Sequence, residues 1–298
     1  MIRHHQIEVG PPARIAHVAE WAAEAPDAPV LVIWSGLGGA WFDWVPVAAR
    51  LPEVRILVID RPGNGDAPDW PPGTHDLEQV VADAGTILDS LGVSAAVFAG
   101  HSMGGWYAEA AAAGHRSRAV GVILLDASPA ADRHRPPGRL TRRIRYTQTR
   151  FAMALLDLAA GLIGWRRLGP WLRKALEGPG PHPGPERDLH RQRCRHTYRR
   201  RGLWQAALVE WAAYPTLRAQ LGELRHARPL GEVPLLNVTA RWYRPGTDTA
   251  EHRPVHRTHR GNTARVRVQP APHMLMLTHP DTVAVLFRQT LDLSPDVP

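Results

Sequence analysis

Short apolar segments recur along the chain, and most have the length and the β-branched content of a strand. In the first four, apolar residues fill successive positions, which is typical of strands covered by helices on both faces. The six segments are residues 30–34, 54–60, 95–100, 120–126, 234–239 and 264–269. Two N-terminal segments, 5–10 and 13–21, predict an antiparallel edge pair, so we expect eight strands in all.

Helical patterns lie between these segments, at residues 42–51, 77–91, 104–113 and 281–291. Alternation of strands and helices at this spacing favours a mostly parallel sheet flanked by helices, with right-handed crossovers. The alternation stops after Asp126, and residues 131–231 have a helical pattern with a Gly- and Pro-rich loop. We therefore predict an α/β core of residues 1–130 and 232–298, with a helical cap of residues 131–231 inserted after the sixth strand.

An apolar stretch at residues 151–165 lies within the predicted cap, and arginines flank it on both sides. It is too short to span a membrane, and Asp157 interrupts it. The pattern favours a helix that packs on the core with its arginines in solvent. The alternatives are a lid for a lipophilic substrate and a contact with an anionic membrane surface. The tryptophans of the cap are candidates for lining a pocket: Trp165, Trp171, Trp204 and Trp211.

The net charge of +8 is typical of a polyanion-binding protein, but the composition has another explanation. Of the 36 basic residues only Lys174 is a lysine, a bias that a GC-rich genome produces, and no nucleic-acid-binding motif accompanies them. The single cysteine, Cys194, excludes an intramolecular disulfide, and the N-terminal residues lack the apolar core of a secretory signal. We therefore expect a cytoplasmic protein that acts on a small molecule.

No cofactor is indicated by the sequence. It contains no phosphate loop, no dinucleotide-binding pattern and no cluster with metal-ligand spacing. The histidine-rich stretch 252–259 is interpreted as an exposed basic loop rather than a metal site.

The stretch "GHSMG" at residues 100–104 joins a predicted strand to a predicted helix. In this context a Gly-x-Ser-x-Gly pattern places its serine, Ser102, at the apex of a sharp turn. The small residues on either side let the strand and the helix approach each other. Amides at the helix N-terminus can then stabilise a developing negative charge. The pattern therefore predicts that Ser102 is a nucleophile.

With this turn, the chain resembles the α/β-hydrolase fold family, whose nucleophile elbow has the same strand–turn–helix form. The segment "VLVIWSGLGGAWFDWVPVAARL" resembles the oxyanion-loop region of that family, and "RILVIDRPGNGDAP" resembles the next strand and its turn. The segment "PHMLMLTHPDTVAVLF" resembles the C-terminal segment that carries the family's catalytic histidine. The resemblance implies the α/β-hydrolase fold and a serine hydrolase that needs no cofactor.

The resemblance also implies which histidine activates Ser102. The family's base lies in the loop after the last strand, where this chain has His273. His101 adjoins the serine, and neighbouring side chains on such a turn diverge. His279 lies beside Pro280 at the start of the last helix, so we interpret it as part of that helix start.

A carboxylate must orient this base, and the family places it after either the sixth or the seventh strand. Asp126 ends the sixth predicted strand, at the carboxyl edge where open α/β sheets hold their active sites. After the later strand, Asp248 is the next carboxylate, although it comes later than is usual in the family. Asp126 is therefore our first candidate and Asp248 the alternative, with Glu251 also left open.

Two backbone amides should bind the oxyanion of the reaction intermediate. The amide of Met103, directly after the serine, is one candidate. The amide of Leu37, in "WSGLGG", is the other. Many members of the family carry a His-Gly pair where this chain has Ser35 and Gly36, so Ser35 or Trp34 must brace the loop differently.

These residues lead to the hypothesis of a serine hydrolase that cleaves an ester, thioester or related acyl bond of a small, lipophilic substrate. Two other hypotheses stay open at this point. An acyltransferase or biosynthetic thioesterase would use the same acyl-enzyme with another acceptor. A ligand-binding protein with a vestigial triad would bind small molecules without turnover. The shared fold does not distinguish them.

Overall fold

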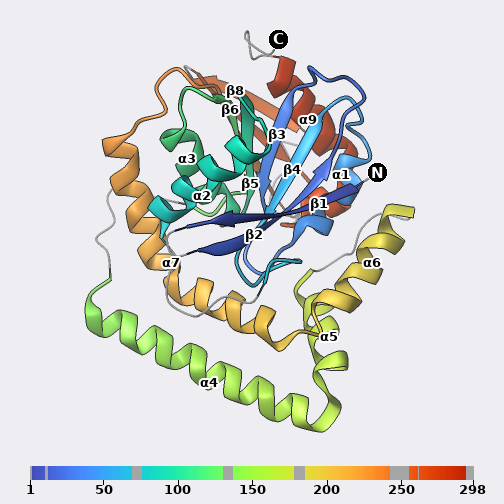
Figure 1. The fold of residues 1–298 in the computed structure, drawn as a ribbon, viewed down its shortest axis with the longest axis vertical. Helices are drawn as coiled ribbons and strands as arrows, with labels where there is room; N and C mark the ends of the chain where they lie inside the picture. Colours follow the sequence, from blue (N-terminus) through green and yellow to red (C-terminus); the bar gives the residue numbers. More distant parts are fainter. Residues whose placement is uncertain are drawn as a thin grey trace, which may run out of the picture.

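The computed structural model of the chain describes residues 2–10, 13–68, 76–129, 137–177, 185–241, 255–260 and 262–292. In this part of the chain, nine strands form one sheet in the order β1-β2-β4-β3-β5-β6-β7-β9-β8 (Figure 1). Pairing is parallel from β4 through β3, β5, β6 and β7 to β9, and antiparallel at both edges. The strands are β1 (Ile2–Val9), β2 (Arg14–Trp21), β3 (Val30–Trp34), β4 (Arg55–Asp60), β5 (Ala96–His101), β6 (Ala119–Leu125), β7 (Leu235–Ala240), β8 (Val255–Arg260) and β9 (Thr263–Val268).

The helices fall into two groups along the chain. One group alternates with the strands and comprises the 3₁₀ helix η1 (Trp41–Trp44), α1 (Val45–Ala48), α2 (Leu77–Ser90), α3 (Gly104–Gly114), α8 (Leu275–Thr278) and α9 (Pro280–Asp292). The other group, here called the inserted helices, lies between β6 and β7 and comprises α4 (Arg139–Ile163), α5 (Trp165–Glu177), α6 (Pro185–Thr197) and α7 (Arg201–Ala227).

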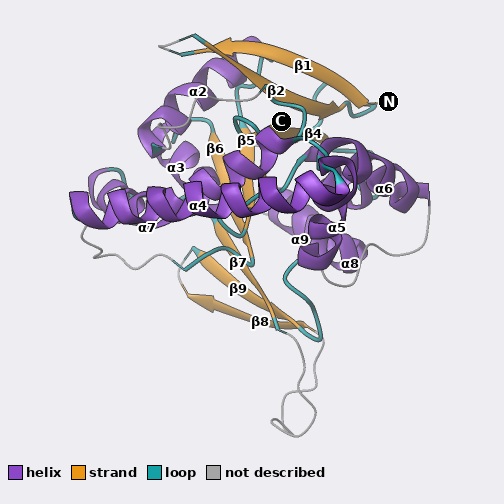
Figure 2. Cartoon of the chain, turned by 90° about the horizontal axis from the view of Figure 1, so that it is seen from below, coloured by secondary structure: helices purple, strands orange, loops and turns teal. Residues whose placement is uncertain are grey.

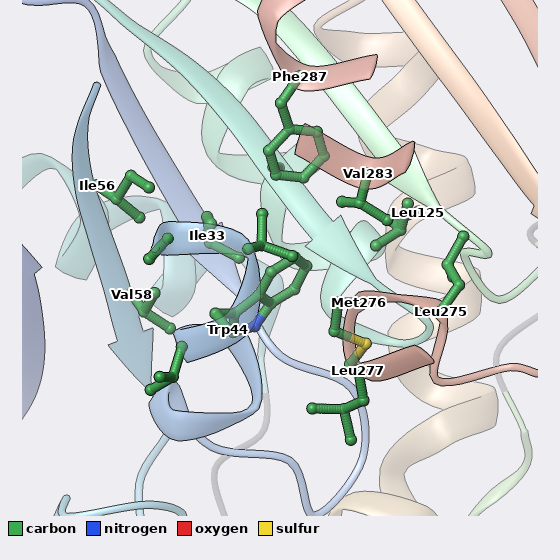
Figure 3. Close-up of a cluster of buried hydrophobic side chains, with 14 of the residues drawn as sticks. Ile33, Trp44, Ile56, Val58, Leu125, Leu275, Met276, Leu277, Val283 and Phe287 are labelled. Atoms are coloured by element: carbon green, nitrogen blue, oxygen red, sulfur yellow. The ribbon is translucent and has the colours of Figure 1, made fainter. Parts of the chain in front are cut away.

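Both faces of the central strands are buried, as their continuous apolar sequences predict. Leu31 and Ile33 of β3 belong to a cluster that also contains residues of α1, α8 and α9. Val32 and Trp34 point to the opposite face, into a cluster with α2 and α3. Figure 3 shows part of the first cluster, in which Trp44 and Phe287 stack with ring centroids 6.2 Å apart. The two clusters thus cover the two faces of the central strands.

The predicted α/β-hydrolase fold is confirmed by this arrangement. Each of the six predicted strands occurs within one residue of its expected position, and the first two segments form the antiparallel edge pair. The additional strand is β8, most of which falls in the histidine-rich stretch 252–259 that we interpreted as a loop. That interpretation was wrong for residues 255–259, because they pair antiparallel with β9 and extend the sheet.

The inserted helices lie together at one end of the sheet. Figures 1 and 2 show α7 running between the sheet and α4, with α4 along the outer edge of the molecule. The apolar stretch predicted at 151–165 is the second half of α4, which begins much earlier, at Arg139. The helix ends at Ile163 because Gly164 takes a positive φ of 79°, a left-handed conformation that favours glycine.

Candidate active site

Ser102 lies at the apex of the turn between β5 and α3. Its φ of 54° is in the left-handed region, which residues other than glycine rarely adopt. The neighbouring glycines are sterically required, because a Cβ atom on Gly100 would overlap the carbonyl group of Gly104, and one on Gly104 would overlap that of Trp34. The backbone N–H of Ser102 donates to the carbonyl oxygen of Leu125 at 3.1 Å, which fixes the apex against β6.

A cavity of about 730 Å³ lies between the carboxyl ends of the strands and the inserted helices. Ser102, His273 and Leu37 all line this cavity, although they come from three distant parts of the chain. Its walls are mainly apolar side chains of the inserted helices, namely Ala152, Leu156, Leu172, Leu176, Leu203, Trp204, Ala207, Leu208 and Trp211. Its volume is in the range that holds a small organic molecule.

Two of the four candidate tryptophans of the inserted helices line this cavity. Trp204 and Trp211 contribute to the cavity wall. The other two do not line it: the side chain of Trp171 is largely exposed to solvent, and Trp165 packs against the cluster that includes α1 and α9.

His273 lies in the loop between β9 and α8, and its imidazole is held by Asp126. Nδ1 of His273 and Oδ2 of Asp126 are 2.5 Å apart, while Oδ1 of Asp126 accepts a hydrogen bond from the Ala240 N–H at 3.0 Å. Asp126 itself has a φ of 44°, so the chain turns sharply where β6 ends. The imidazole of His273 is 54% exposed, which leaves its other nitrogen accessible. The alternative acids, Asp248 and Glu251, lie outside the described residues.

His101 does not diverge from the site but is buried beside His273. Its Nε2 lies 2.9 Å from the carbonyl oxygen of His273 and donates to it, and the two rings have centroids 4.5 Å apart. Burial and the nearby His273 lower the pKa of His101 to about 3, so it stays neutral at neutral pH. His279 lies at the junction of α8 and α9, where its backbone N–H donates to the carbonyl oxygen of Leu275 at 2.7 Å and so caps α8. The hydrogen bond from His101 thus holds the loop that carries His273.

Replacing His101 by leucine is expected to lower kcat by up to about 10²-fold with little change in KM, because the His273 loop loses its donor and shifts. The variant His101→Gln keeps an N–H donor and should recover most of the activity. Ester turnover by the three proteins checks this, and equal activity in all three would contradict it.

The same histidine should make stability depend on pH. Between pH 6.5 and about 3 the unfolded chain binds a proton at His101 that the folded chain does not, so stability falls as the pH falls. Urea unfolding at pH 7 and pH 4.5 should show a smaller loss for His101→Gln than for the unmodified protein.

The loop that carries Leu37 is fixed through its carbonyl groups. The guanidinium of Arg61 donates to the carbonyl oxygens of Ser35 and Gly36, the latter at 2.6 Å. A trans peptide is planar, so fixing the Gly36 carbonyl also fixes the Leu37 N–H, which points the opposite way. Ser35 braces the loop with its side chain, which donates to the Ala40 carbonyl at 3.2 Å and accepts from Nε1 of Trp44 at 3.0 Å. Of the two candidates from the sequence, Ser35 and Trp34, the structure shows that Ser35 braces the loop.

Arg61 is in turn paired with a carboxylate from the inserted helices. Glu210 of α7 is fully buried, and its Oε1 lies 2.6 Å from Nε of Arg61. The hydroxyl of Tyr198 donates to the Gly38 carbonyl at 2.6 Å, a second link from the inserted helices to the loop. Sequence analysis missed these residues, although the lone carboxylate of Glu210 within an apolar helical pattern was a signal.

The variant Arg61→Met is expected to lower the free energy of unfolding by about 3–5 kcal/mol, because the buried Glu210 loses its partner. The matched control is Arg201→Met. Arg201 and Asp157 form a bidentate pair at 2.7 Å, but their side chains are 48% and 35% exposed, so its loss should cost under about 1 kcal/mol. Urea unfolding of both variants provides the test, and equal losses would contradict it.

A second buried network holds the end of the loop that carries Leu37. Asp43 accepts hydrogen bonds from Arg173 at 2.6 Å and from His190 at 3.0 Å. Burial alone would raise the pKa of Asp43, but these two partners hold it below its usual range. Glu177, His190 and Cys194 have potential metal-ligand atoms within 4.8 Å of one another. However, Nε of Arg173 lies 3.4 Å from Glu177 and already supplies positive charge, so the group links helices α5 and α6 to the loop.

A further group of potential metal ligands consists of His4, His17 and Asp66. Both ring nitrogens of His17 are engaged, one with Asp60 at 2.8 Å and the other with His4 at 3.0 Å. Of these residues, His190 and Cys194 are also close in the sequence, four residues apart on one face of α6. The other members of both groups come from separate elements.

Comparison with known proteins identifies the family of this chain. The model of the alpha/beta hydrolase family matches residues 31–286. The chain belongs to that family. It is 40% identical over 81 residues to the "Putative carbamate hydrolase RutD" of Stutzerimonas stutzeri, a match that covers 27% of this chain and 31% of that protein. The chain thus spans about a third of the length of the curated relatives that it matches.

Solved structures of this alpha/beta hydrolase fold align with almost the whole chain. Cfl2 from Burkholderia cenocepacia has a TM-score of 0.68 at 23% identity, covering 97% of this chain and 96% of its own. The epoxide hydrolase CorEH has a TM-score of 0.69 at 16% identity, covering 98% of this chain and 99% of its own. At these identities the likeness concerns the fold alone.

Proposed function

We propose that this alpha/beta hydrolase is a serine hydrolase that cleaves an ester, or a related acyl bond, of a small lipophilic substrate. One observation carries the proposal. Ser102, strained at its turn, faces the same apolar cavity as His273, whose Nδ1 is held by Asp126 at 2.5 Å. The hydrogen bond to Asp126 keeps the Nδ1 proton in place, so that Nε2 is the nitrogen available as a base.

In the proposed reaction, Oγ of Ser102 attacks the carbonyl carbon of the substrate while its proton passes to Nε2 of His273. The amides of Leu37 and Met103 donate to the resulting oxyanion. His273 then returns the proton to the leaving alcohol, which leaves an acyl group on Ser102. A water molecule, activated by His273 in the same way, releases the acid and restores the serine.

The apolar cavity supports a lipophilic substrate. Arg173 and Asp43 also line it, but they neutralise each other through a hydrogen bond at 2.6 Å. Each methylene that enters the cavity should therefore raise kcat/KM by up to about fourfold, the equivalent of about 0.8 kcal/mol. The relative named as a carbamate hydrolase also supports chemistry at a carbonyl carbon.

A series of p-nitrophenyl esters with increasing acyl length tests the proposal. We expect a burst of p-nitrophenol equal to the enzyme concentration and an acyl adduct in the intact mass. The succinate half-ester, which is similar in length to the butyrate ester but charged, is the matched control and should turn over slowly. Added short alcohols show whether the acyl group passes to an acceptor other than water.

Two results would contradict the proposal. The first is opening of the epoxide ring of styrene oxide with no ester turnover. This substrate is tested because CorEH, which shares the fold, is named an epoxide hydrolase. The second is tight binding of the longer esters with neither turnover nor an acyl adduct, which would indicate a ligand-binding protein.

A further inference from the structure

Helix α4 is apolar on two opposite faces. Thr149, Met153 and Ala160 are buried, on the face that packs against α7. A second set of apolar side chains lies on the opposite side of the helix, and each of them is between 49% and 84% exposed: Leu140, Ile144, Phe151, Leu155, Leu158 and Leu162. At 100° per residue these positions fall within a sector of about 60°. We call this set the α4 outer face. Soluble proteins rarely leave such a continuous apolar strip in water.

Basic residues lie beside the α4 outer face. They are exposed: Arg139, Arg143 and Arg150 lie along one side of the strip in the first half of the helix, and Arg166 and Arg167 follow its end. Among the described residues, no carboxylate forms an ion pair with any of these five. The only carboxylate of α4, Asp157, is neutralised by Arg201 in a bidentate pair. The strip is therefore apolar, with positive charge along one side and beyond its C-terminal end.

We propose that the α4 outer face docks on an anionic lipid surface, with the helix lying in the plane of the interface. Leucine and phenylalanine side chains would enter the acyl boundary, and arginine heads would reach the lipid phosphates. The attachment is peripheral. None of the described helices combines the length and apolar character needed to cross a bilayer.

Charge complementarity favours lipid over a second copy of the chain. Two copies joined through this face would bring the five arginines beside each strip close together, with no acidic side chain on the strip left to neutralise them. An anionic surface instead attracts each arginine. The charge around the strip therefore selects a negatively charged partner, and the apolar middle selects one with a hydrocarbon interior.

The docking face continues into the cavity. Gln148, Ala152 and Leu156 of α4 line the cavity on the side of the helix next to the outer face. Leu176 and Trp211 also line it and yet are 73% and 41% exposed, so the cavity reaches the surface through apolar side chains. If the proposed function holds, docking would bring this opening close to lipophilic substrates in the membrane.

Vesicle flotation with the full chain tests the docking. We expect binding to phosphatidylcholine vesicles that contain phosphatidylglycerol, weaker binding at high salt and little binding to phosphatidylcholine alone. The triple variant Leu155→Gln, Leu158→Gln, Leu162→Gln should lose affinity at least about tenfold. The matched control is Val285→Gln, which changes an apolar side chain on α9 that is also 48% exposed and should bind as the unmodified protein does.

Binding is measured without turnover, so its outcome is separate from that of the proposed hydrolase activity. The substituted leucines lie outside the cavity, and urea unfolding establishes that the variant is folded. Three results would overturn the proposal: no binding of the unmodified protein to anionic vesicles, equal binding by the triple variant, or a dimer in solution that the triple variant abolishes.

Discussion

The variant Ser102→Ala is expected to lower kcat for ester hydrolysis by about 10⁶-fold, while KM for the same ester changes little. The hydroxyl group forms the acyl-enzyme, and its loss leaves only the oxyanion amides and the cavity to promote attack by water. The fold should persist, because the turn is held by backbone contacts to Leu125 and by the two flanking glycines rather than by the serine side chain. Steady-state turnover and labelling by a fluorophosphonate probe measure the effect.

The matched control is Ser128→Ala, which removes a hydroxyl group close to the same turn. The backbone N–H of Ser128 donates to the Ser102 carbonyl at 2.9 Å, an interaction that the substitution keeps. Turnover by this variant should stay within about twofold of the unmodified protein, in line with a conservative surface change. Fluorophosphonate labelling that persists in Ser102→Ala would show that another residue is the nucleophile and would overturn the proposed mechanism.

The variant Asp126→Asn is expected to lower kcat by about 10⁴-fold. An amide at this position can donate to Nδ1 of His273, which moves the imidazole proton to Nε2 and removes the base that faces Ser102. The carboxylate of Asp126 also has a structural role, since it accepts a hydrogen bond from the Ala240 N–H at 3.0 Å. Asparagine retains an oxygen for that bond. The activity should therefore fall far more than the stability, as ester kinetics and urea unfolding together measure.

Asp248→Asn provides the comparison for this assignment. If Asp126 is the acid, Asp248→Asn keeps full activity within about twofold. The reverse result, an active Asp126→Asn and an inactive Asp248→Asn, would move the role of the acid to the loop after β7. It would leave Asp126 with the structural role of joining the ends of β6 and β7.

Much of the fold follows from local patterns. Short apolar segments placed six strands within one residue, and in the first four of them burial on both faces imposes a continuous apolar pattern that a few residues reveal. The Ser102 turn could be predicted for a similar reason, because the steric demand on Gly100 acts within the motif itself, where a Cβ atom would overlap Gly104. The position of His273 after the last strand came from the resemblance to a family, not from the residues alone.

Other features depend on partners that are distant in the sequence. The strand β8 has a polar, histidine-rich sequence, and its pairing with β9 decides its conformation. The buried pair of Arg61 and Glu210 joins positions 149 residues apart, so no local pattern indicates that it fixes the Leu37 peptide. Sequence separation also hid the network of Asp43, Arg173 and His190.

The sequence by itself determined the parallel strands, the turn that carries Ser102 and the apolar second half of α4, because periodicity and steric limits act over neighbouring residues. Only the tertiary structure decided that Asp126 meets His273, that Arg61 holds the Leu37 loop, and which apolar face of α4 remains in water. These outcomes depend on how whole elements pack. Helix α4 has two apolar faces, and the packing of the inserted helices decides which of them α7 covers.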